Sequence, residues 1–223
     1  NGYVYSRKEL EDIGKLALKH DLTIVSDEIY EYLVYDEAEH VSIASLSQEI
    51  QERTIVINGM SKAYAMTGWR IGYTASPLNV AKAMTNFQSH STSCPNSIAQ
   101  FAALCALSGP DDHLKSMVQE FDRRRKRIVE LINATPGLSC IAPKGAFYVM
   151  MNISALFGKR ISGTPIVDSM SFTQLLLEDS QVAVVPGIGF GADSFVRLSY
   201  ATSMENIEKG LERISAFVQR LTD

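Results

Sequence analysis

Hydrophobic residues recur at helical spacing near the start of the chain. Leu10, Ile13 and Leu16 are three residues apart, which places them on one face of a helix. Ser6 and Glu9 have the spacing of a capping box, in which each residue satisfies a free backbone group at the start of a helix. The pattern therefore predicts a helix over residues 7–20.

Short apolar runs predict three strands, at residues 22–25, 54–57 and 69–74. The first two are continuous and rich in β-branched side chains, which is typical of strands buried on both faces of a parallel sheet. Asp27 and Tyr30 follow the first run, and Lys62 lies on the loop between the second and the third. Because ligands of open α/β sheets collect outside the carboxyl ends of the strands, we expect these side chains to meet.

The second half of the chain changes from a helical to a mixed pattern. Beyond residue 77 the pattern turns helical, with a break at residues 91–95, and it predicts helices at residues 96–107 and 111–133. Later segments predict strands at residues 146–151, 182–185 and 195–200 and a helix at residues 169–177. Thr202 and Glu205 form the capping box of a last helix. The change in pattern predicts two domains, residues 1–118 and residues 119–223, with the long helix as their connector.

The charge balance excludes several classes of partner. The chain has 21 basic and 25 acidic residues, a net charge of -4, whereas proteins that bind nucleic acids or anionic membranes usually carry a basic face. The basic run at residues 123–127 lies inside the long helix and is expected to be its solvated face. No run approaches the roughly 20 apolar residues that span a bilayer. We expect neither nucleic acid nor membrane among its partners.

The cysteines and histidines give no sign of a metal site. Cys94, Cys105 and Cys140 are odd in number and far apart, and the four histidines are scattered, without the spacing of zinc ligands. Reduced thiols are the simplest interpretation. They favour a cytoplasmic location.

One segment has a pattern that indicates covalent chemistry. Residues 58–73 read Asn-Gly-Met-Ser-Lys-Ala-Tyr-Ala-Met-Thr-Gly-Trp-Arg-Ile-Gly-Tyr, with Lys62 on a glycine-bordered loop and Arg70 eight residues later. Most loop lysines are simply solvated, whereas a nucleophilic amine needs a fixed position at a strand end. The segment resembles the lysine loop of the class I and II aminotransferases, which are fold type I enzymes that use pyridoxal 5'-phosphate. Further segments resemble motifs of this family in the same order, at residues 2–6, 26–30 and 195–199, so the resemblance covers essentially the whole chain.

The resemblance implies a role for each matching residue. Lys62 would carry the cofactor covalently and, once displaced from it, would move a proton from the substrate Cα. Asp27 would lie against the ring nitrogen of the cofactor, because the ring withdraws electrons only while this nitrogen is protonated. Tyr30 would hydrogen-bond the phenolic oxygen of the cofactor.

Two arginines and a serine complete the implied site. Arg70 would bind the cofactor phosphate, for which a planar and permanently charged group is suited. Ser61 would also reach the phosphate, although many relatives have a second serine where this chain has Gly59. Arg197 would hold the α-carboxylate of the substrate through two parallel hydrogen bonds. The glycine-rich residues 186–191 lead into a strand instead of a helix, which excludes a dinucleotide site, and we assign them no direct catalytic role.

The resemblance implies an α/β fold, in which the large-domain sheet of a fold type I enzyme, truncated at its N-terminus, precedes a smaller C-terminal α/β domain. It implies transamination between an L-amino acid and a 2-oxo acid, as in aspartate and aromatic aminotransferases, and a homodimer for the full-length protein. Family members begin well before the segment that residues 2–6 resemble, so this chain by itself is expected to be weak or inactive. Two alternatives stay open: another fold type I enzyme such as a lyase or synthase, and a cofactor-binding sensor domain of a transcription regulator.

Overall fold

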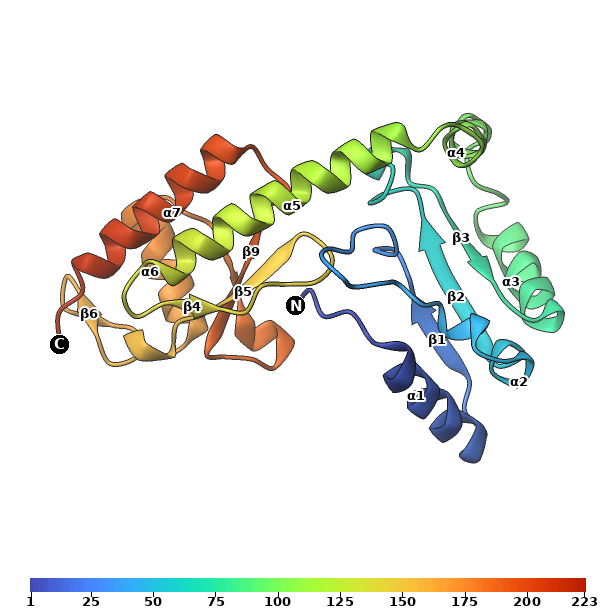
Figure 1. Cartoon of the computed structure of the whole chain (residues 1–223), viewed down its shortest axis with the longest axis horizontal. Coiled ribbons are helices and arrows are strands. Elements are labelled where there is room, and N and C mark those ends of the chain that lie inside the picture. Colours follow the sequence, from blue (N-terminus) through green and yellow to red (C-terminus); the bar gives the residue numbers. More distant parts are fainter. The chain divides into compact units, whose positions relative to one another are not determined.

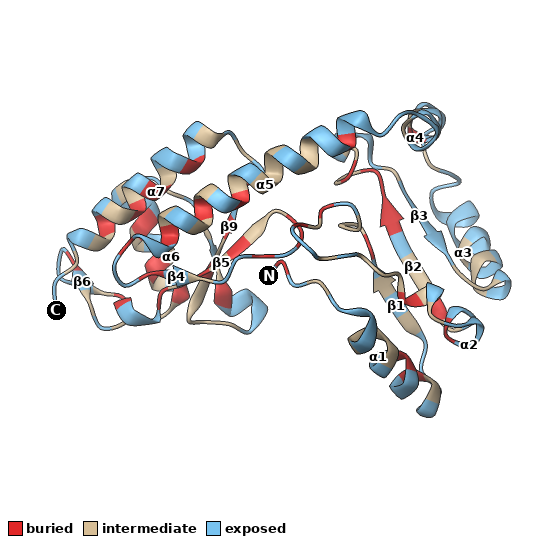
Figure 2. Cartoon of the chain, in the orientation of Figure 1, coloured by how far each residue is buried: buried red, intermediate tan, exposed pale blue.

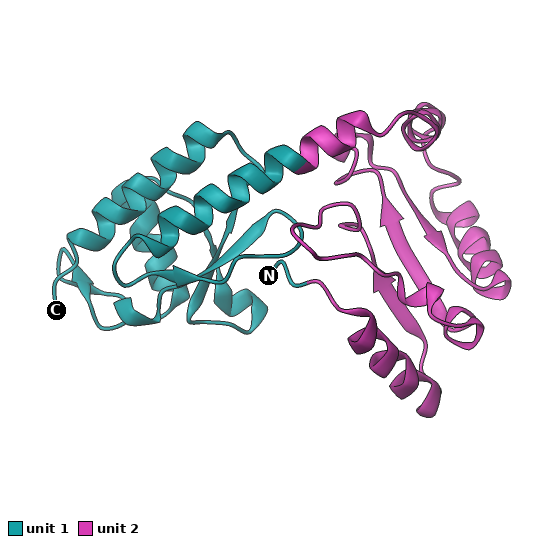
Figure 3. Cartoon of the chain, viewed as in Figure 1, with its two compact units in different colours: residues 1–3, 119–223 teal, residues 4–118 magenta.

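Two groups of helices and strands can be distinguished along the chain (Figure 3). The computed structural model describes all 223 residues. One unit consists of Val4–Val118, and the other consists of Asn1–Tyr3 together with Gln119–Asp223. The boundary falls within the long helix α5 (Asp112–Asn133), which contributes residues to both units. Each unit has a sheet of its own.

The sheet of the Val4–Val118 unit has three strands in the order β1-β2-β3 (Figure 1). They are β1 (Ile24–Asp27), β2 (Thr54–Gly59) and β3 (Gly72–Ala75). β1 runs parallel to β2, with Asp27 opposite Ile57, and β3 runs antiparallel to β2. The carboxyl ends of β1 and β2 therefore lie side by side, which confirms the arrangement that the strand pattern predicted.

Helix α1 begins at the predicted capping box. The Ser6 hydroxyl oxygen accepts a hydrogen bond from Glu9 N, and the Glu9 carboxylate accepts one from Ser6 N. At Gly14 the helix lies against Ile50, because a Cβ atom at Gly14 would be 2.5 Å from the Ile50 Cδ1 atom. The helices of this unit are α1 (Arg7–Lys19), α2 (Gln48–Gln51), α3 (Leu78–Ser91) and α4 (Ser97–Ser108).

β1 is less buried than its apolar sequence indicates. The prediction of a strand buried on both faces at residues 22–25 is wrong, since the strand begins at Ile24 and the Leu22 and Val25 side chains are 53% and 62% exposed. Apolar side chains of a strand are buried only where a second layer covers that face of the sheet. The exposure of Val25 shows that its side chain lacks such a cover.

β3 is shorter than predicted. Residues 69–74 do not form one strand, because Thr67–Trp69 make a 3-10 turn and Arg70 has a left-handed backbone with φ of 51°. Regular pairing with β2 starts at Gly72. The lysine loop therefore ends in a sharp turn before the strand.

The other unit contains a four-stranded antiparallel sheet in the order β4-β5-β9-β8 (Figure 1). Its strands are β4 (Ser139–Cys140), β5 (Tyr148–Asn152), β8 (Val185–Pro186) and β9 (Phe195–Ser199). A separate hairpin consists of β6 (Arg160–Ile161) and β7 (Thr164–Pro165). The helices are most of α5, α6 (Ser169–Ser180) and α7 (Met204–Gln219). Across the whole chain, none of the helices combines the length and the apolar composition that crossing a lipid bilayer requires.

Large apolar side chains form the core of this second unit. Figure 2 colours the buried segments of the chain red. Phe172 of α6 meets Phe217 of α7 edge to face, with the ring centres 5.8 Å apart, and both are fully buried. Val149 of β5 and Val196 of β9 are also fully buried. The Tyr200 hydroxyl donates a hydrogen bond to a backbone oxygen at 3.0 Å, so its burial leaves no polar group unsatisfied.

Two predicted details of the helices are wrong. α7 is capped by Ser203, whose side chain accepts a hydrogen bond from Asn206 N, and not by Thr202. In the basic run at residues 123–127, Arg125 is 3% exposed and donates hydrogen bonds to Asp122, so the run is not entirely solvated. Five consecutive residues turn more than once around a helix axis, and one of them therefore faces the core.

The 3-10 turn η4 (Gly187–Phe190) depends on the absence of a side chain at Gly187. A Cβ atom there would lie 2.1 Å from the Ala192 oxygen and 2.2 Å from the Phe195 oxygen, and both are backbone atoms that cannot move aside. Gly187→Ala is therefore expected to lower the free energy of unfolding of this unit by about 1–3 kcal/mol. Gly189 lies in the same turn with no atom within 4 Å of its Cβ position, so Gly189→Ala is the matched control.

Thermal unfolding followed by circular dichroism measures this difference, and hydrogen exchange of peptides from β9 locates it. Equal stability of the two variants would show that the turn tolerates a side chain at Gly187.

Candidate active site

The predicted lysine and tyrosine lie together at the carboxyl ends of β1 and β2. Lys62 is on the loop after β2, and its Nζ atom is 5.8 Å from the centre of the Tyr30 ring. Tyr30 lies in the turn after β1, and Asp27 is the last residue of that strand. The Asp27 carboxylate is exposed and accepts a hydrogen bond from Ile29 N at 3.2 Å. An amine, a phenol and a carboxylate thus come from neighbouring strand ends of one sheet.

The backbone of the lysine loop is fixed at both ends. Met60 N donates a hydrogen bond to Ile71 O, and Met66 N donates one to Met60 O, both at 3.2 Å. The side chains of Met60 and Ala63 are buried. Lys62 is therefore held between two buried anchors, as a nucleophilic amine requires.

β2 and β3 approach each other closely where the lysine loop begins. Gly59 pairs with Gly72, and a Cβ atom on Gly59 would lie 2.9 Å from the Gly72 Cα atom. A Cβ atom on Gly72 would lie 2.8 Å from the Asn58 oxygen. A side chain at either position would push the strands apart, which explains the glycine at position 59.

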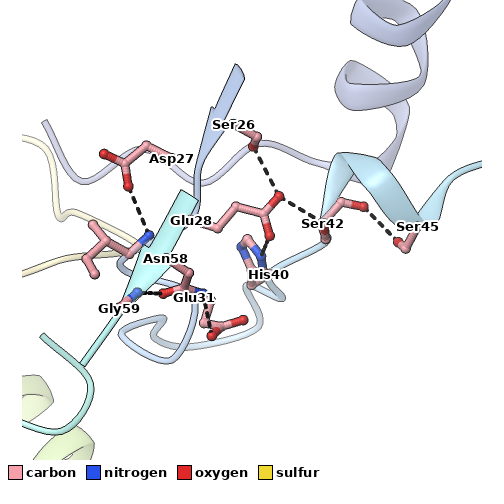
Figure 4. Close-up of polar contacts among 10 residues, drawn as sticks. Ser26, Asp27, Glu28, Glu31, His40, Ser42, Ser45, Asn58 and Gly59 are labelled. Carbon is pink, nitrogen blue, oxygen red and sulfur yellow. Dashed lines mark hydrogen bonds and ion pairs between the residues drawn. The ribbon is translucent and has the colours of Figure 1, made fainter. Parts of the chain in front are cut away.

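A buried carboxylate organises the segment that follows β1 (Figure 4). Glu28 is 7% exposed, and its carboxylate accepts three hydrogen bonds, from Ser26 Oγ at 3.0 Å, Ser42 Oγ at 2.9 Å and His40 Nε2 at 3.1 Å. Because an ionised carboxylate can only accept, the Nε2 atom of His40 carries the proton. Burial raises the pKa of Glu28, but the hydrogen bonds from these three side chains outweigh it, so this pKa lies below its usual value. The carboxylates of Asp27 and Glu28 point in different directions (Figure 4).

A further hydrogen bond joins this segment to the end of β2 (Figure 4). The buried Asn58 donates a hydrogen bond from Nδ2 to Glu31 Oε1 at 2.7 Å. Tyr30 stands between Glu28 and Glu31 in the sequence, so side-chain hydrogen bonds hold the chain on both sides of it. The hydrogen bonds of Glu28 and the hydrogen bond from Asn58 to Glu31 therefore fix Tyr30 relative to the strand end from which the Lys62 loop starts.

The two predicted phosphate-binding residues keep hydrogen-bonding groups available. Arg70 is exposed, and one of its guanidinium nitrogens, Nη1, donates to Thr67 O at 2.8 Å. Its other guanidinium nitrogens have no partner within the chain. The half-buried Ser61 hydroxyl also makes no hydrogen bond within the chain. Phosphate binding by these two residues stays a prediction.

Arg197 belongs to the other unit, where it lies on β9 and pairs with Met150 of β5. Its guanidinium carbon is 4.4 Å from the centre of the Tyr148 ring and 4.4 Å from that of the Phe190 ring. Although partly buried, it forms no ion pair within the chain. Burial of an unpaired charge is costly, so a half-buried arginine of this kind is suited to receive an anionic ligand.

One known protein family matches almost the whole chain. The family described as aminotransferase class I and II matches residues 1–214. The chain belongs to this family. An aspartate aminotransferase from Bacillus sp. (strain YM-2) is 49% identical over 218 residues, which are 98% of this chain and 55% of that protein. This class I and II aminotransferase chain therefore spans about half the length of the curated relatives it matches.

Solved structures of aminotransferases have the same fold. The aspartate aminotransferase from Rhizobium meliloti is 44% identical and matches with a TM-score of 0.96, over 100% of this chain and 56% of that chain. The aromatic aminotransferase from Pyrococcus horikoshii is 40% identical, with a TM-score of 0.89 over 98% of this chain and 57% of that chain. These similarities confirm the predicted fold type I architecture.

Two residues that hold the segment around Tyr30, Glu28 and Asn58, and two that contact Arg197 in the other unit, Tyr148 and Phe190, were not identified from the sequence. Glutamate and asparagine side chains at strand ends are ordinarily exposed, so Glu28 and Asn58 carry no distinguishing signal. Strand alternation offers a signal for Tyr148, because it predicts that residues 148 and 150 share one face of β5. Phe190 lies in the glycine-rich turn, where the one aromatic side chain is the feature that could have singled it out.

Glu28→Gln is expected to lower the free energy of unfolding of the Val4–Val118 unit by about 1–3 kcal/mol at neutral pH, because it removes the charge that three donors satisfy. Trp69 is the only tryptophan of the chain and lies in this unit, so its fluorescence during urea unfolding reports on this unit. Glu37 is an exposed glutamate of the same segment, and Glu37→Gln is the control.

This loss of stability should depend on pH. The pKa of Glu28 in the folded protein lies below its unfolded value of about 4.3, so the ionised carboxylate stabilises the fold above that pH. The contribution is lost as the pH falls through the folded-state pKa, and the difference between native protein and Glu28→Gln should narrow below about pH 4. A difference that stays constant down to about pH 3 would mean that the charge of Glu28 contributes nothing.

Proposed function

We propose that the full-length protein is a pyridoxal 5'-phosphate-dependent transaminase, which exchanges an amino group between an L-amino acid and a 2-oxo acid. The observation that carries this proposal is the position of Lys62, whose amine lies 5.8 Å from the Tyr30 ring at neighbouring strand ends. Membership of the class I and II aminotransferases supports it. Relatives named aspartate aminotransferase and aromatic aminotransferase favour acidic or aromatic amino acids as substrates.

The residues of the Val4–Val118 unit fit this cofactor. Lys62 would hold it covalently, and Tyr30 would hydrogen-bond the oxygen on its ring. The exposed Asp27 carboxylate forms no ion pair within the chain, so it is suited to accept a hydrogen bond from a protonated ring nitrogen. Arg70 and Ser61 have donors left for a phosphate, and the planar guanidinium of Arg70 matches the phosphate oxygens.

In the proposed reaction the cofactor and three side chains each have a distinct role. When bound, pyridoxal phosphate supplies an electron sink for the negative charge that develops at the substrate Cα. Arg197 would bind the substrate α-carboxylate and so fix the direction of the Cα–H bond. The Lys62 amine, free once the substrate amine has displaced it, would then take the proton from Cα. Asp27 would lie against the ring nitrogen and so favour the protonated form of that nitrogen.

The proposal includes a homodimer and a cytoplasmic location for the full-length protein. One face of α4 leaves Ile98, Phe101 and Leu104 exposed, and apolar patches of this kind favour association. All three cysteines are free thiols, which fits a reducing compartment. Analytical ultracentrifugation of the full-length protein would reveal a monomer if the dimer were absent.

Borohydride reduction followed by peptide mass spectrometry tests the cofactor site. Full-length protein mixed with pyridoxal phosphate is expected to carry a reduced pyridoxyl group on Lys62, and Lys62→Ala should abolish the label there. Lys82 is an exposed lysine of α3, and Lys82→Ala should leave labelling of Lys62 unchanged. Native full-length protein without a label on Lys62 would refute the proposed cofactor site.

Product analysis separates transamination from a lyase or synthase reaction. Without a 2-oxo acid acceptor, the full-length protein should release only a stoichiometric amount of keto product, because its cofactor retains the amino group. Addition of a 2-oxo acid should restore repeated turnover. Repeated turnover without an acceptor would contradict transamination and indicate the alternative class.

A further inference from the structure

The guanidinium group of Arg197 lies between two aromatic rings. The centres of the Tyr148 and Phe190 rings are each 4.4 Å from its central carbon. Both distances are well inside the range in which a cation is attracted by the face of an aromatic ring. The two rings come from different elements of the unit, so two separate parts of the chain must be in place to form this arrangement.

Pairing of β5 with β9 brings Tyr148 to Arg197. Tyr148 pairs with Ser199, and Met150 pairs with Arg197, so Tyr148 is the diagonal neighbour of Arg197 on the adjacent strand. Such diagonal neighbours lie on the same face of a sheet, within reach of an aromatic or a long side chain. The strand register therefore determines the contact.

A separate set of contacts holds Phe190. It ends η4, the turn that closes tightly because Gly187 has no Cβ atom. Within this turn Ile188 N donates a hydrogen bond to the Ser169 hydroxyl at 3.1 Å. Ser169 is fully buried and donates in turn to Asp193 Oδ1 at 2.6 Å. A buried hydrogen-bond network thus ties the turn that carries Phe190 to the start of α6.

The ring contacts leave the N–H donors of the Arg197 guanidinium group available for a ligand. A guanidinium group is planar, and its N–H donors point outward in that plane, where they match the two oxygens of a carboxylate. An aromatic ring attracts the cation through its face. It does not accept hydrogen bonds from the N–H groups as a carboxylate would, so these donors stay available. No carboxylate of the chain pairs with Arg197.

We infer that Tyr148 and Phe190 are positioning residues, which hold the guanidinium group of Arg197 so that it receives the carboxylate of the substrate. The inference rests on the proposed function, in which Arg197 is the group that binds this carboxylate. Both residues act through Arg197 and not on the cofactor. Loss of either ring should therefore weaken carboxylate binding while cofactor binding is unchanged.

Phe190 gives the cleaner test, because its ring is its only interacting group. In the full-length protein loaded with pyridoxal phosphate, Phe190→Leu should raise the dissociation constant of succinate about three- to tenfold. The KM values for the amino acid and the 2-oxo acid should rise by a similar factor, with kcat affected less, and the absorption spectrum of the bound cofactor should be unchanged. Phe190→Tyr keeps the ring face and should restore most of the affinity. Ile188→Leu is an exposed change in the same turn and serves as the control.

Two further measurements distinguish positioning from a general effect on folding. Tyr148→Leu removes the other ring from a different element and should weaken succinate binding in the same way. In an Arg197→Lys background, which lacks the planar fork, Phe190→Leu should have little additional effect on succinate binding, because its action requires the guanidinium group.

The inference would be overturned by unchanged succinate affinity in Phe190→Leu, by an equal loss in Phe190→Tyr, or by a full additional loss in the Arg197→Lys background. Succinate binding is measured by calorimetry and needs no turnover. Native protein that binds succinate but does not transaminate would therefore refute the proposed function, while the comparison of variants would still decide the role of the two rings.

Discussion

The Glu28 side chain is almost completely buried. Hydrogen bonds from Ser26, Ser42 and His40 replace those that water would make to its carboxylate. Burial of a charged group is tolerated only when such donors surround it. The donors come from both sides of the turn that contains Tyr30, since Ser26 precedes this turn and the other two follow it. The requirement to satisfy one buried charge thus closes a segment of irregular chain around the phenol that lies next to Lys62.

Neighbouring carboxylates at the end of β1 have opposite environments. Successive side chains of a strand point to opposite faces, so Asp27 and Glu28 are separated although they are adjacent in the chain. Glu28 is enclosed by donors from its own unit, whereas Asp27 is exposed and receives a single backbone hydrogen bond. One carboxylate at this strand end is therefore used inside the unit, and the other remains accessible to a ligand.

The sequence predicts the parts of this structure that depend on local patterns. The Ser6 and Glu9 capping box and the parallel strands before Lys62 follow from spacing that is visible in a single chain. Burial of Val25 could not be predicted in the same way, because an apolar strand residue is buried only by a layer that its own segment does not encode. The left-handed backbone at Arg70 was missed for a related reason, since arginine has no preference for that conformation and the surrounding turn imposes it.

The candidate site residues also differ in whether local sequence patterns or distant parts of the chain determine their positions. Lys62, Asp27 and Tyr30 could be placed from their position after strands, whereas the ring contacts of Arg197 depend on the register of β5 with β9 and on the shape of a distant turn. Hydrogen bonds between residues 14 positions apart, such as that from Ser42 to Glu28, have no periodic signature in a sequence. Contacts that hold a side chain in place are therefore harder to predict than the position of that side chain after a strand.

The facing glycines of β2 and β3 bear on how this protein can evolve. Gly59 and Gly72 have no functional group, yet a methyl group on either would collide with backbone of the opposite strand. Neither position can change independently, and even a paired change would separate the strands from which the Lys62 loop starts. The geometry of the Lys62 loop therefore constrains two residues that have no side chain, and neutral divergence should accumulate at other positions of the chain.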